Sequence, residues 1–428
     1  MSNTLAFILA NPRTLAFGVA TAFLSSFGQT FFISLFGGEI RAAFDLSHGG
    51  FGTIYAAGTL TSAAVLIWAG RKIDDWDLRH YTAVIGLGLA LACVAMATTQ
   101  SAAWLVVAVF MLRFFGQGLM SHTSSATTAR YFDADRGKAL SIAGMGYPVA
   151  EAAYPIIAVT VMAWLGWRGA WFACAAFMVA ATVPVSYWLL KGHAERHRRH
   201  LEQLDEDQRT GKRGPGWTRA QMLRDPRFYL LMPSYLAPSF IYTGLFFHQI
   251  HLVDAKGWDL TVFAASYSAY AVAQVAAVFV SGWLVDRFSA WAMMRYYLMP
   301  LALGCVVLST VSGAAAIPFY MVLIGISSGT VAVVHSAILA EIYGVRHLGA
   351  IKALATALMV FSSAGGPVLM GWLIDAGVTM EAIALGSAVY VVGAAGVIMV
   401  IPVLFPGPVN RPPPSTGTGD GSAIKDTR

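Results

Sequence analysis

Long apolar segments, following one another along almost the whole chain, are the feature that most limits what this sequence can fold into. Twelve are recognisable, each close to the ~20 residues that a helix needs to cross a membrane. In lipid every backbone amide must be satisfied within its own segment, so we expect helices. A barrel would need alternating stretches of ~10 residues, which the sequence lacks. The segments lie near residues 14–36, 51–70, 81–100, 103–126, 139–161, 169–190, 228–252, 262–284, 291–312, 317–340, 350–374 and 383–405.

The composition disfavours the common soluble classes. Of 428 residues, 57% are hydrophobic and only 12% are charged, about half the ~25% charge of a soluble domain. A cytosolic enzyme, a disulfide scaffold and a nucleic-acid binder are therefore poor interpretations. The three cysteines, Cys93, Cys174 and Cys305, are isolated in apolar stretches and lack metal-ligand spacing. No metal and no cofactor are expected.

The basic residues predict how the chain is oriented. With the N-terminus inside, the inner side holds 24 of the 28 lysines and arginines, and the outer connectors hold Arg41, Arg168 and Lys256. This asymmetry follows the positive-inside rule. The basic pI near 9.2 is then a consequence of topology, and no nucleic-acid partner is expected. We predict a multi-pass protein of the bacterial inner membrane with both termini in the cytoplasm.

An internal repeat divides the chain into halves. Gly70 and Asp74 follow the second segment, and Gly282 and Asp286 follow the eighth at an offset of 212. The even number of helices in each half gives both the same orientation, a known transporter plan. We predict a six-helix bundle at 12–190, a basic cytoplasmic linker at 191–227, a second six-helix bundle at 228–405 and a disordered Pro/Gly/Ser-rich tail at 406–428. Asp225-Pro226 is expected to open the seventh helix.

Two loop sequences carry a resemblance to a known family. GRKIDDWDLR at 70–79 and GWLVDRF at 282–288 are similar to the loop signature of the major facilitator superfamily, and LRFFGQG at 112–118 resembles its helix-4 motif with an intramembrane arginine. The resemblance covers about residues 12–405. It implies an all-α membrane protein of twelve transmembrane helices in two six-helix pseudo-symmetric bundles. At subfamily level, GQTFFISLF with the helix-4 arginine resembles bacterial monocarboxylate or oxalate/formate-type carriers.

The resemblance implies that the loop signatures control conformation and do not bind substrate. Asp74 and Asp286 would pair with arginines and helix ends across the cytoplasmic seam and stabilise the outward-open state. Ordinary charged loop residues are the alternative. The candidate gate comprises Gly70, Asp74, Arg79, Arg136, Gly282, Asp286 and Arg287.

Two ionisable residues lie deep within predicted spans. A charge at the bilayer centre costs about 2.5–3.5 kcal/mol on insertion scales, so such residues are kept where they pair or line a wet cavity. Arg113 offers a donor fork suited to a carboxylate, and the alternative is an arginine held by helix carbonyls. Glu151 suits coupling to protons, and the alternative is a permanently paired or hydrogen-bonded glutamate. Both residues are expected at similar depth, facing each other or sharing the cavity.

Further polar and aromatic side chains near mid-membrane complete the candidate site. Amides are costly to leave unpaired in a membrane, whereas each aromatic residue alone is also compatible with packing. His248 is a candidate second proton site or outer-gate contact. With Arg113 and Glu151, the candidate binding residues are Gln29, Gln117, Tyr147, Tyr154, His248, Tyr270, Gln274, Ser327 and Ser328.

These features favour a secondary transporter over the other classes of membrane protein. The chain has no GxxxxGK[ST] and no HExxH, which disfavours an ATP-driven pump and an intramembrane zinc enzyme. We predict proton-coupled transport (symport) or exchange of a small organic anion, a carboxylate above all, by a monomer in contact with membrane lipid. A carrier of a neutral or aromatic compound such as a vitamin, or a drug or metabolite exporter, stays open as the alternative. The exporter is disfavoured because helix 5 has Pro148 and Pro155 without the Gly-Pro pair of family exporters.

Overall fold

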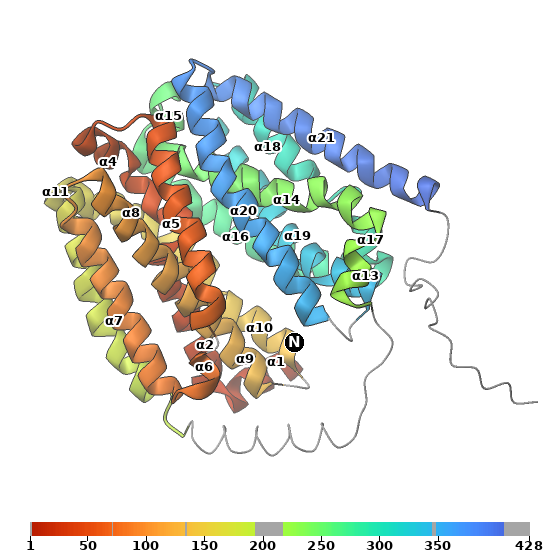
Figure 1. Ribbon diagram of the computed structural model, residues 1–428, viewed down its shortest axis with the longest axis horizontal. Coiled ribbons are helices and arrows are strands. Elements are labelled where there is room, and N and C mark those ends of the chain that lie inside the picture. The colour runs from red at the N-terminus through yellow and green to blue at the C-terminus, as the bar shows by residue number, and fades with distance from the viewer. Residues whose placement is uncertain (1, 71, 133–134, 193–216, 345–347, 406–428) are drawn as a thin grey trace, which may run out of the picture.

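The computed structural model describes residues 2–70, 72–132, 135–192, 217–344 and 348–405, which form helices and short connections with no strand among them (Figure 1). The predicted tail at 406–428 and most of the predicted linker lie outside these ranges. The first half contains α1 (Ser2–Ala10), α2 (Pro12–Ser25), η1 (Ser26–Gly28), α3 (Thr30–Ile33), η2 (Ser34–Phe36), α4 (Gly37–Phe44), α5 (His48–Ala69), α6 (Lys72–Asp75), α7 (Leu78–Ala97), α8 (Ala102–Met111), η3 (Leu112–Met120), α9 (Ser121–Tyr131), α10 (Arg136–Gly144), α11 (Gly146–Val183) and η4 (Pro184–Trp188). The second half contains α13 (Arg219–Leu223), α14 (Pro226–Phe247), α15 (Gln249–Lys256), α16 (Leu260–Phe288), α17 (Ala290–Met293), α18 (Met299–Thr310), α19 (Ala316–Tyr343), α20 (Leu348–Asp375) and α21 (Met380–Leu404).

The helices account for the predicted membrane spans. Within the described ranges nine helical stretches are long and apolar enough to cross a membrane, and the bent pair Pro12–Gly28 and Thr30–Phe44 makes a tenth. One of the nine, Gly137–Trp188, contains a break at Gly166 (φ 68°, ψ 170°) and so covers two predicted segments. The apolar helix Met299–Thr310 is shorter and covers the ninth. All twelve predicted segments are therefore helical.

Local sequence explains where several helices begin. The Asp225 side chain accepts a hydrogen bond from the backbone N–H of Arg227 at 3.0 Å, and Pro226 occupies the first position of α14. The predicted start of the seventh helix is confirmed. Ser47 and Ser101 cap α5 and α8 in the same manner, each accepting from a backbone N–H three residues later.

Three spans depart from regular helix along their length. The first is interrupted at Gln29, which is extended (ψ 152°), and the seventh is interrupted at His248 between α14 and α15. The fourth widens into the π-helix η3 around Arg113. Such irregular backbone within a membrane is tolerated where other protein groups satisfy it.

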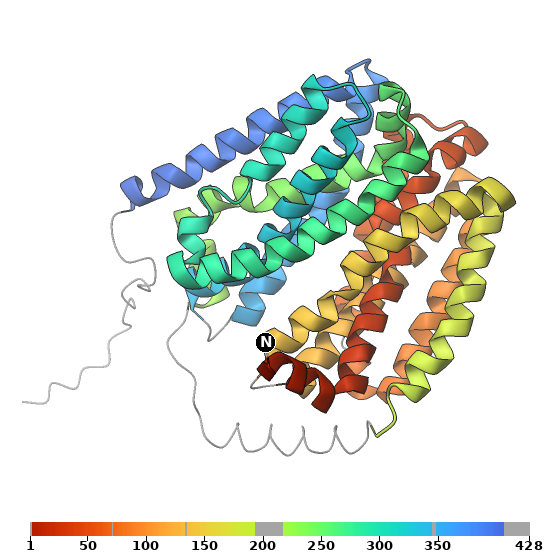
Figure 2. The same ribbon diagram turned by 180° about the vertical axis from the view of Figure 1, so that it is seen from behind.

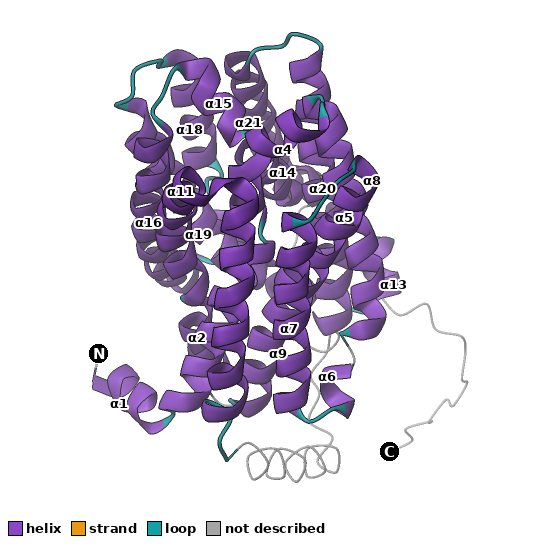
Figure 3. Cartoon of the chain, turned by 90° about the vertical axis from the view of Figure 1, so that its left-hand side faces the viewer, coloured by secondary structure: helices purple, strands orange, loops and turns teal. Residues whose placement is uncertain are grey.

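Most of the packing between the two halves is along two pairs of helices. α5 packs against α20, and α11 packs against α16. Figures 1 and 2 show the two bundles converging at the end that carries α4 and α15 and diverging toward the end that carries α6 and α13. Figure 3 shows α1 and α6 at one end of the molecule and α4 and α15 at the other. We call these the α6 end and the α15 end.

Candidate functional site

A polar cavity of about 260 Å³ lies between the two halves. The first half contributes residues from the break in the first span and from α11, and the second half contributes residues from α14 and α16. No lysine, arginine or histidine lines it within the described ranges, so Glu151 is its charged group. The lining residues are Gln29, Thr30, Phe31, Tyr147, Glu151, Tyr242, Thr243, Phe246, Tyr267 and Gln274.

Glu151 reaches the cavity from α11. The side chain of Gln274 on α16 lines the same cavity, so one polar side chain from each half meets here. The Oε2 atom of Glu151 is buried and has no hydrogen-bond partner among the described residues. A carboxylate oxygen left this way can take a proton, a water or a donor group of a substrate.

Gln274 belongs to a hydrogen-bonded array on the second half. Its Nε2 donates to Ser328 Oγ at 3.0 Å, and the hydroxyl of Tyr270 donates to the same oxygen at 3.1 Å. Ser328 on α19 thus ties together two residues of α16. Ser327, its neighbour, is fully buried and lies beside Tyr242, a cavity residue. The array holds the Gln274 amide in place opposite Glu151.

Tyr147 stands one helical turn before Glu151 and lines the same cavity. Its hydroxyl is hydrogen-bonded to Ser121 Oγ on α9. Residues four apart on a helix share a face, which explains why both side chains line this cavity.

Arg113 lies behind the cavity wall and is not part of its lining. The side chain is 2% exposed, and its Nη1 donates to the backbone oxygen of Gly28 at 3.1 Å. The guanidinium also lies 5.2 Å from the ring centroid of Tyr55. The Tyr55 hydroxyl in turn bonds to Thr30 Oγ1, a cavity group. Arg113 and Glu151 therefore do not contact each other in this structure.

The break in the first span explains the position of Arg113. The carbonyl of Gly28 precedes the extended residue Gln29 and is therefore available to a side-chain donor. The first and fourth spans cross closely here, because a Cβ on Gly28 would stand 2.2 Å from the Leu112 oxygen. The Arg113 Nε atom has no partner within the described residues, and no carboxylate there pairs with the guanidinium.

Three predicted binding residues lie elsewhere. Tyr154 lines a neighbouring apolar cavity of about 280 Å³, with its ring stacked on Phe27 and its hydroxyl donating to the Phe23 oxygen at 3.3 Å. Gln117 lies on η3 near Arg113 and is not among the residues lining the Glu151 cavity. His248 is at the α15 end, where its Nε2 is 2.9 Å from the Pro367 oxygen. The structure brings together Gln29, Tyr147, Glu151 and Gln274 at the cavity, with Tyr270, Ser327 and Ser328 beside it.

A second polar cluster, which the sequence analysis did not select, joins the halves toward the α15 end. Gln249 Nε2 donates to the Phe31 oxygen at 2.9 Å and to Ser34 Oγ at 2.8 Å, and its Oε1 accepts from Tyr267 at 2.6 Å. Gln249 is fully buried. The sequence signal that could have identified Gln249 is its position as an amide inside an apolar segment, where an unpaired amide is costly.

The proposed gate residues lie at the α6 end. The side chains of Asp74 and Arg136 lie outside the described part of the chain. Gly70 ends α5, and Gly282 lies on α16. Arg79 lies in the first turn of α7, and its backbone N–H donates to the Asp77 side chain at 2.8 Å. Asp286 and Arg287 are exposed, and the Arg287 guanidinium lies over Trp283 at 5.7 Å from the ring centroid.

Residues 18–321 and 249–426 match the family model of the Major Facilitator Superfamily. The chain belongs to this superfamily. The predicted fold class is therefore confirmed, and family and fold together indicate a membrane transporter of small molecules.

Two curated relatives are transporters of different kinds. Over 343 residues the chain is 26% identical to monocarboxylate transporter 13 of Bos taurus, a match that covers 76% of this chain and 74% of that protein. A stretch of 120 residues is 29% identical to the multidrug resistance protein B homolog of Mycobacterium tuberculosis. That second match spans 28% of this chain and only 22% of the relative.

Solved structures share the architecture. The chain superposes on a bacterial homolog of the human lysosomal transporter Spinster in its inward-facing, unoccupied form with a TM-score of 0.67. The sequence identity is 14%, and the match covers 91% of this chain and 96% of that one. The inward-facing, occupied form of the same protein gives a TM-score of 0.66 over 90% of this chain and 95% of that one.

Proposed function

We propose that this superfamily member is a monomeric carrier of the bacterial inner membrane that moves a small carboxylate together with a proton by alternating access, without converting it. The observation that supports this is the presence of two charged side chains within the spans, neither of which has a side-chain partner of opposite charge within the described residues. Glu151 lines the central cavity, and Arg113 stands behind its wall. A 26% identical relative named as a monocarboxylate transporter agrees with the choice of cargo.

Charge balance explains why a proton and an anion would travel together. When Glu151 is ionised, it balances the fixed charge of Arg113 across the wall, and an added carboxylate would make the region net negative. When Glu151 is protonated, Arg113 is left uncompensated and attracts an anion. In a low-dielectric site a net charge is costly, so the proton and the anion are expected to bind as a pair.

The polar groups of the cavity suit a carboxylate that enters this way. Gln29 carries amide N–H groups, and Tyr242 and Thr243 carry hydroxyls, all of which can donate to carboxylate oxygens. Aromatic rings of Phe31, Phe246 and Tyr267 can pack against an apolar body. The cargo contacts are thus hydrogen bonds and packing, while Arg113 acts through its charge.

The convergence of the bundles supports an inward-facing state for this conformation. The halves are held together at the α15 end, which the distribution of basic residues predicts to be outside. In this state the gate pairs proposed for Asp74 and Asp286 at the α6 end would be separated, and they would form when that end closes. His248 lies in the outer contact and would act there as a gate residue.

A proton-flux assay with the Glu151→Gln variant tests this function. Wild-type protein in liposomes that hold a pH-sensitive dye should acidify the lumen when a monocarboxylate such as pyruvate, lactate or benzoate is added outside. Glu151→Gln keeps the size and hydrogen-bonding capacity of the side chain but cannot release a proton, so uphill transport should stop while exchange of labelled substrate continues. Glu39→Gln, which removes an exposed carboxylate on α4, should behave as wild type. Undiminished proton-driven uptake by Glu151→Gln would overturn the assignment.

The alternative is a carrier of neutral or aromatic compounds, or an exporter of apolar drugs. It is favoured by the five aromatic and two amide side chains that face the cavity beside Glu151 and by the multidrug relative. Under this alternative the charge of Arg113 is structural. Uptake of an uncharged aromatic compound with no effect of monocarboxylates on the dye signal would establish it.

A further inference from the structure

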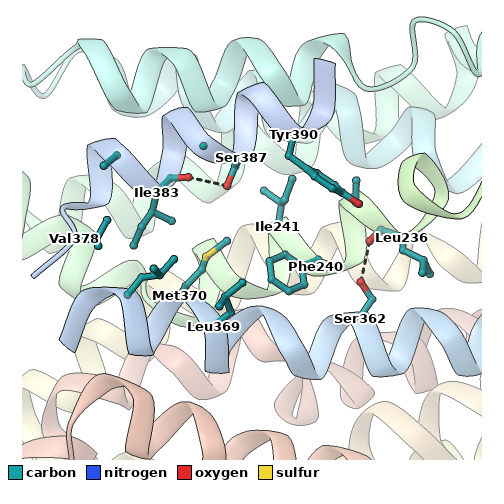
Figure 4. A pocket seen from close by; sticks show the side chains of 14 residues that line it. Leu236, Phe240, Ile241, Ser362, Leu369, Met370, Val378, Ile383, Ser387 and Tyr390 are labelled. Carbon is teal, nitrogen blue, oxygen red and sulfur yellow. Dashed lines mark hydrogen bonds between the residues drawn. The ribbon is translucent and has the colours of Figure 1, made fainter. Parts of the chain in front are cut away.

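A larger cavity, of about 470 Å³, lies between α14, α20 and α21 (Figure 4). It shares no lining residue with the Glu151 cavity. α20 and α21 follow each other in the chain, but they separate from their common turn and leave α14 as the floor between them (Figure 1). We call this cavity the α20–α21 groove.

The walls of the groove suit a hydrocarbon occupant. Its three hydroxyl groups already donate to backbone oxygens: Ser362 to Leu236 at 3.1 Å, Ser387 to Ile383 at 2.8 Å and Tyr390 to Pro233 at 3.1 Å. The remaining lining residues are apolar or glycine. A polar ligand would therefore lose its hydrogen bonds to water without finding donors in exchange.

The position and length of the groove indicate which hydrocarbon fits. Along α20 its lining runs from Leu373, two residues before the helix ends at the α15 end, to Ser362. That distance is about three turns, or ~16 Å at 1.5 Å per residue. The hydrocarbon core of a bilayer is ~30 Å thick, so the groove extends through about one leaflet. An acyl chain of a lipid in that leaflet has this direction and this depth.

The rim of the groove continues into the surface that faces the membrane. Leu369 and Tyr390 line the groove and are 47% and 49% exposed, and Leu385 and Val389 beside it on α21 are 51% and 65% exposed. All three walls belong to stretches apolar enough to span a membrane. The medium in front of the opening is thus lipid, and an unfilled groove would forfeit dispersion contacts along its walls.

We propose that the α20–α21 groove is a binding site for one acyl chain of a phospholipid from the leaflet at the α15 end. The acyl chain would lie against α20 on the side opposite to α5. Gly371 approaches His48 of α5, with a Cβ on Gly371 only 2.6 Å from the His48 oxygen, while Leu369 and Leu373 line the groove. Residues two apart on a helix point about 200° apart, so the lipid braces α20 from behind the contact between the halves.

Photolabelling in vesicles tests the site. The protein is reconstituted into phosphatidylethanolamine–phosphatidylglycerol vesicles that contain a phospholipid with a diazirine near mid-chain, and adducts are mapped by peptide mass spectrometry. Wild-type protein should be labelled on the groove residues of α20 and α21 several-fold more strongly than on exposed positions of α7 such as Val84 and Leu87.

Two matched glycine variants decide between a site and ordinary surrounding lipid. Gly386 lines the groove and Gly393 does not, while both are exposed on α21 and a Cβ on either meets no atom within 4 Å. Gly386→Phe should fill the groove and reduce its labelling to the level on α7, and Gly393→Phe should leave it at the wild-type level. Ala382→Phe, also in the groove, provides a second filling variant if Gly386→Phe does not fold.

Each other outcome contradicts the proposal. Equal labelling of the groove and α7 means that the lipid there is ordinary bilayer lipid. If enhanced labelling of the groove residues persists in both Gly386→Phe and Ala382→Phe, the acyl chain binds elsewhere. Protein–protein cross-links through the groove in place of lipid adducts mean that a second copy covers it, and displacement of the label by a transported apolar compound makes it a substrate site.

Discussion

The carboxylate of Asp375, at the end of α20, accepts a hydrogen bond from the backbone N–H of His48, the first residue of α5, at 2.9 Å. Its other oxygen accepts from the next N–H, that of Gly49, at 2.8 Å. Helix N-termini carry unpaired N–H groups and favour negative charge, so one half of the molecule caps a helix of the other. A Cβ on Gly49 would stand 2.2 Å from the Trp372 ring, and a larger residue there would push the two helices apart.

Asp375→Asn is expected to loosen the contact at the α15 end. The variant loses the charge and one of two acceptor oxygens, and because Asp375 is exposed the loss is limited to about 1 kcal/mol, or roughly a fivefold change in the opening equilibrium. Distances between spin labels on exposed positions of α4 and α21, measured by double electron–electron resonance, should show a larger open population. Glu39→Gln serves as the control at the same end, and identical distance distributions in all three proteins would refute the role of Asp375.

Substitutions of Arg113 separate the two candidate functions. Arg113→Gln removes the electrostatic attraction of an anion, which we expect to be worth about 1.5–3 kcal/mol, so affinity for a monocarboxylate should fall about 10- to 100-fold. It also removes the charged donor bond to the Gly28 oxygen, which affects stability. Arg113→Lys keeps the charge without the planar fork, so its affinity for a monocarboxylate should lie between those of the wild type and Arg113→Gln. Binding is measured by isothermal calorimetry with lactate or benzoate. Arg168→Lys is the control, because Arg168 also donates to a carbonyl, Thr99 at 3.0 Å, and lies over Trp167. Unchanged affinity in Arg113→Gln would favour the neutral-compound carrier.

Gly28→Ala is expected to destabilise the crossing of the first and fourth spans. The added methyl would meet the backbone oxygen of Leu112 at 2.2 Å, and backbone cannot rotate away as a side chain can. Overpacking of this kind costs about 1–3 kcal/mol. A thermal-shift measurement in detergent should show a lower midpoint for Gly28→Ala and an unchanged or higher one for Gly144→Ala, where the Cβ meets open space. Equal midpoints would show that the close approach is not required.

Gln249 and Tyr267 are expected to act as a coupled pair. Gln249→Leu leaves the Phe31 oxygen and the Tyr267 hydroxyl without their buried partner, and Tyr267→Phe removes the other end of the 2.6 Å bond. Buried groups in one network show interaction energies of about 0.5–3 kcal/mol in double-mutant cycles. Denaturation of the two single variants and the double variant measures the coupling. Additive effects would place the two side chains in separate networks.

The cavity shows where reasoning from helical spacing succeeds and where it stops. Tyr147 and Glu151, four residues apart, both line it, as expected of one face of α11. Tyr154, three residues further, turns into the adjacent apolar cavity because its ring stacks on Phe27 at 4.6 Å and its hydroxyl finds the Phe23 oxygen. Spacing indicates a face of a helix, but the neighbouring helix decides which cavity the side chain enters.

Arg113 illustrates the same limit for a charged group. Its depth in the fourth span follows from counting residues, and the cost of burying its charge marks it as significant. The partner it contacts, the oxygen of Gly28, is available only because the first span is interrupted at Gln29. No motif in the sequence predicts that interruption, since the segment reads as one apolar run.

The sequence by itself determined the number and helical state of the spans and the duplicated plan, because in lipid each segment must satisfy its own backbone and because matching loop residues recur at an offset of 212. Only the tertiary structure decided that Glu151 faces a cavity, that Arg113 stands behind its wall and that Asp375 caps α5. These relations depend on how each helix is rotated, on breaks within spans and on the approach of segments hundreds of residues apart. Local sequence patterns do not contain this information.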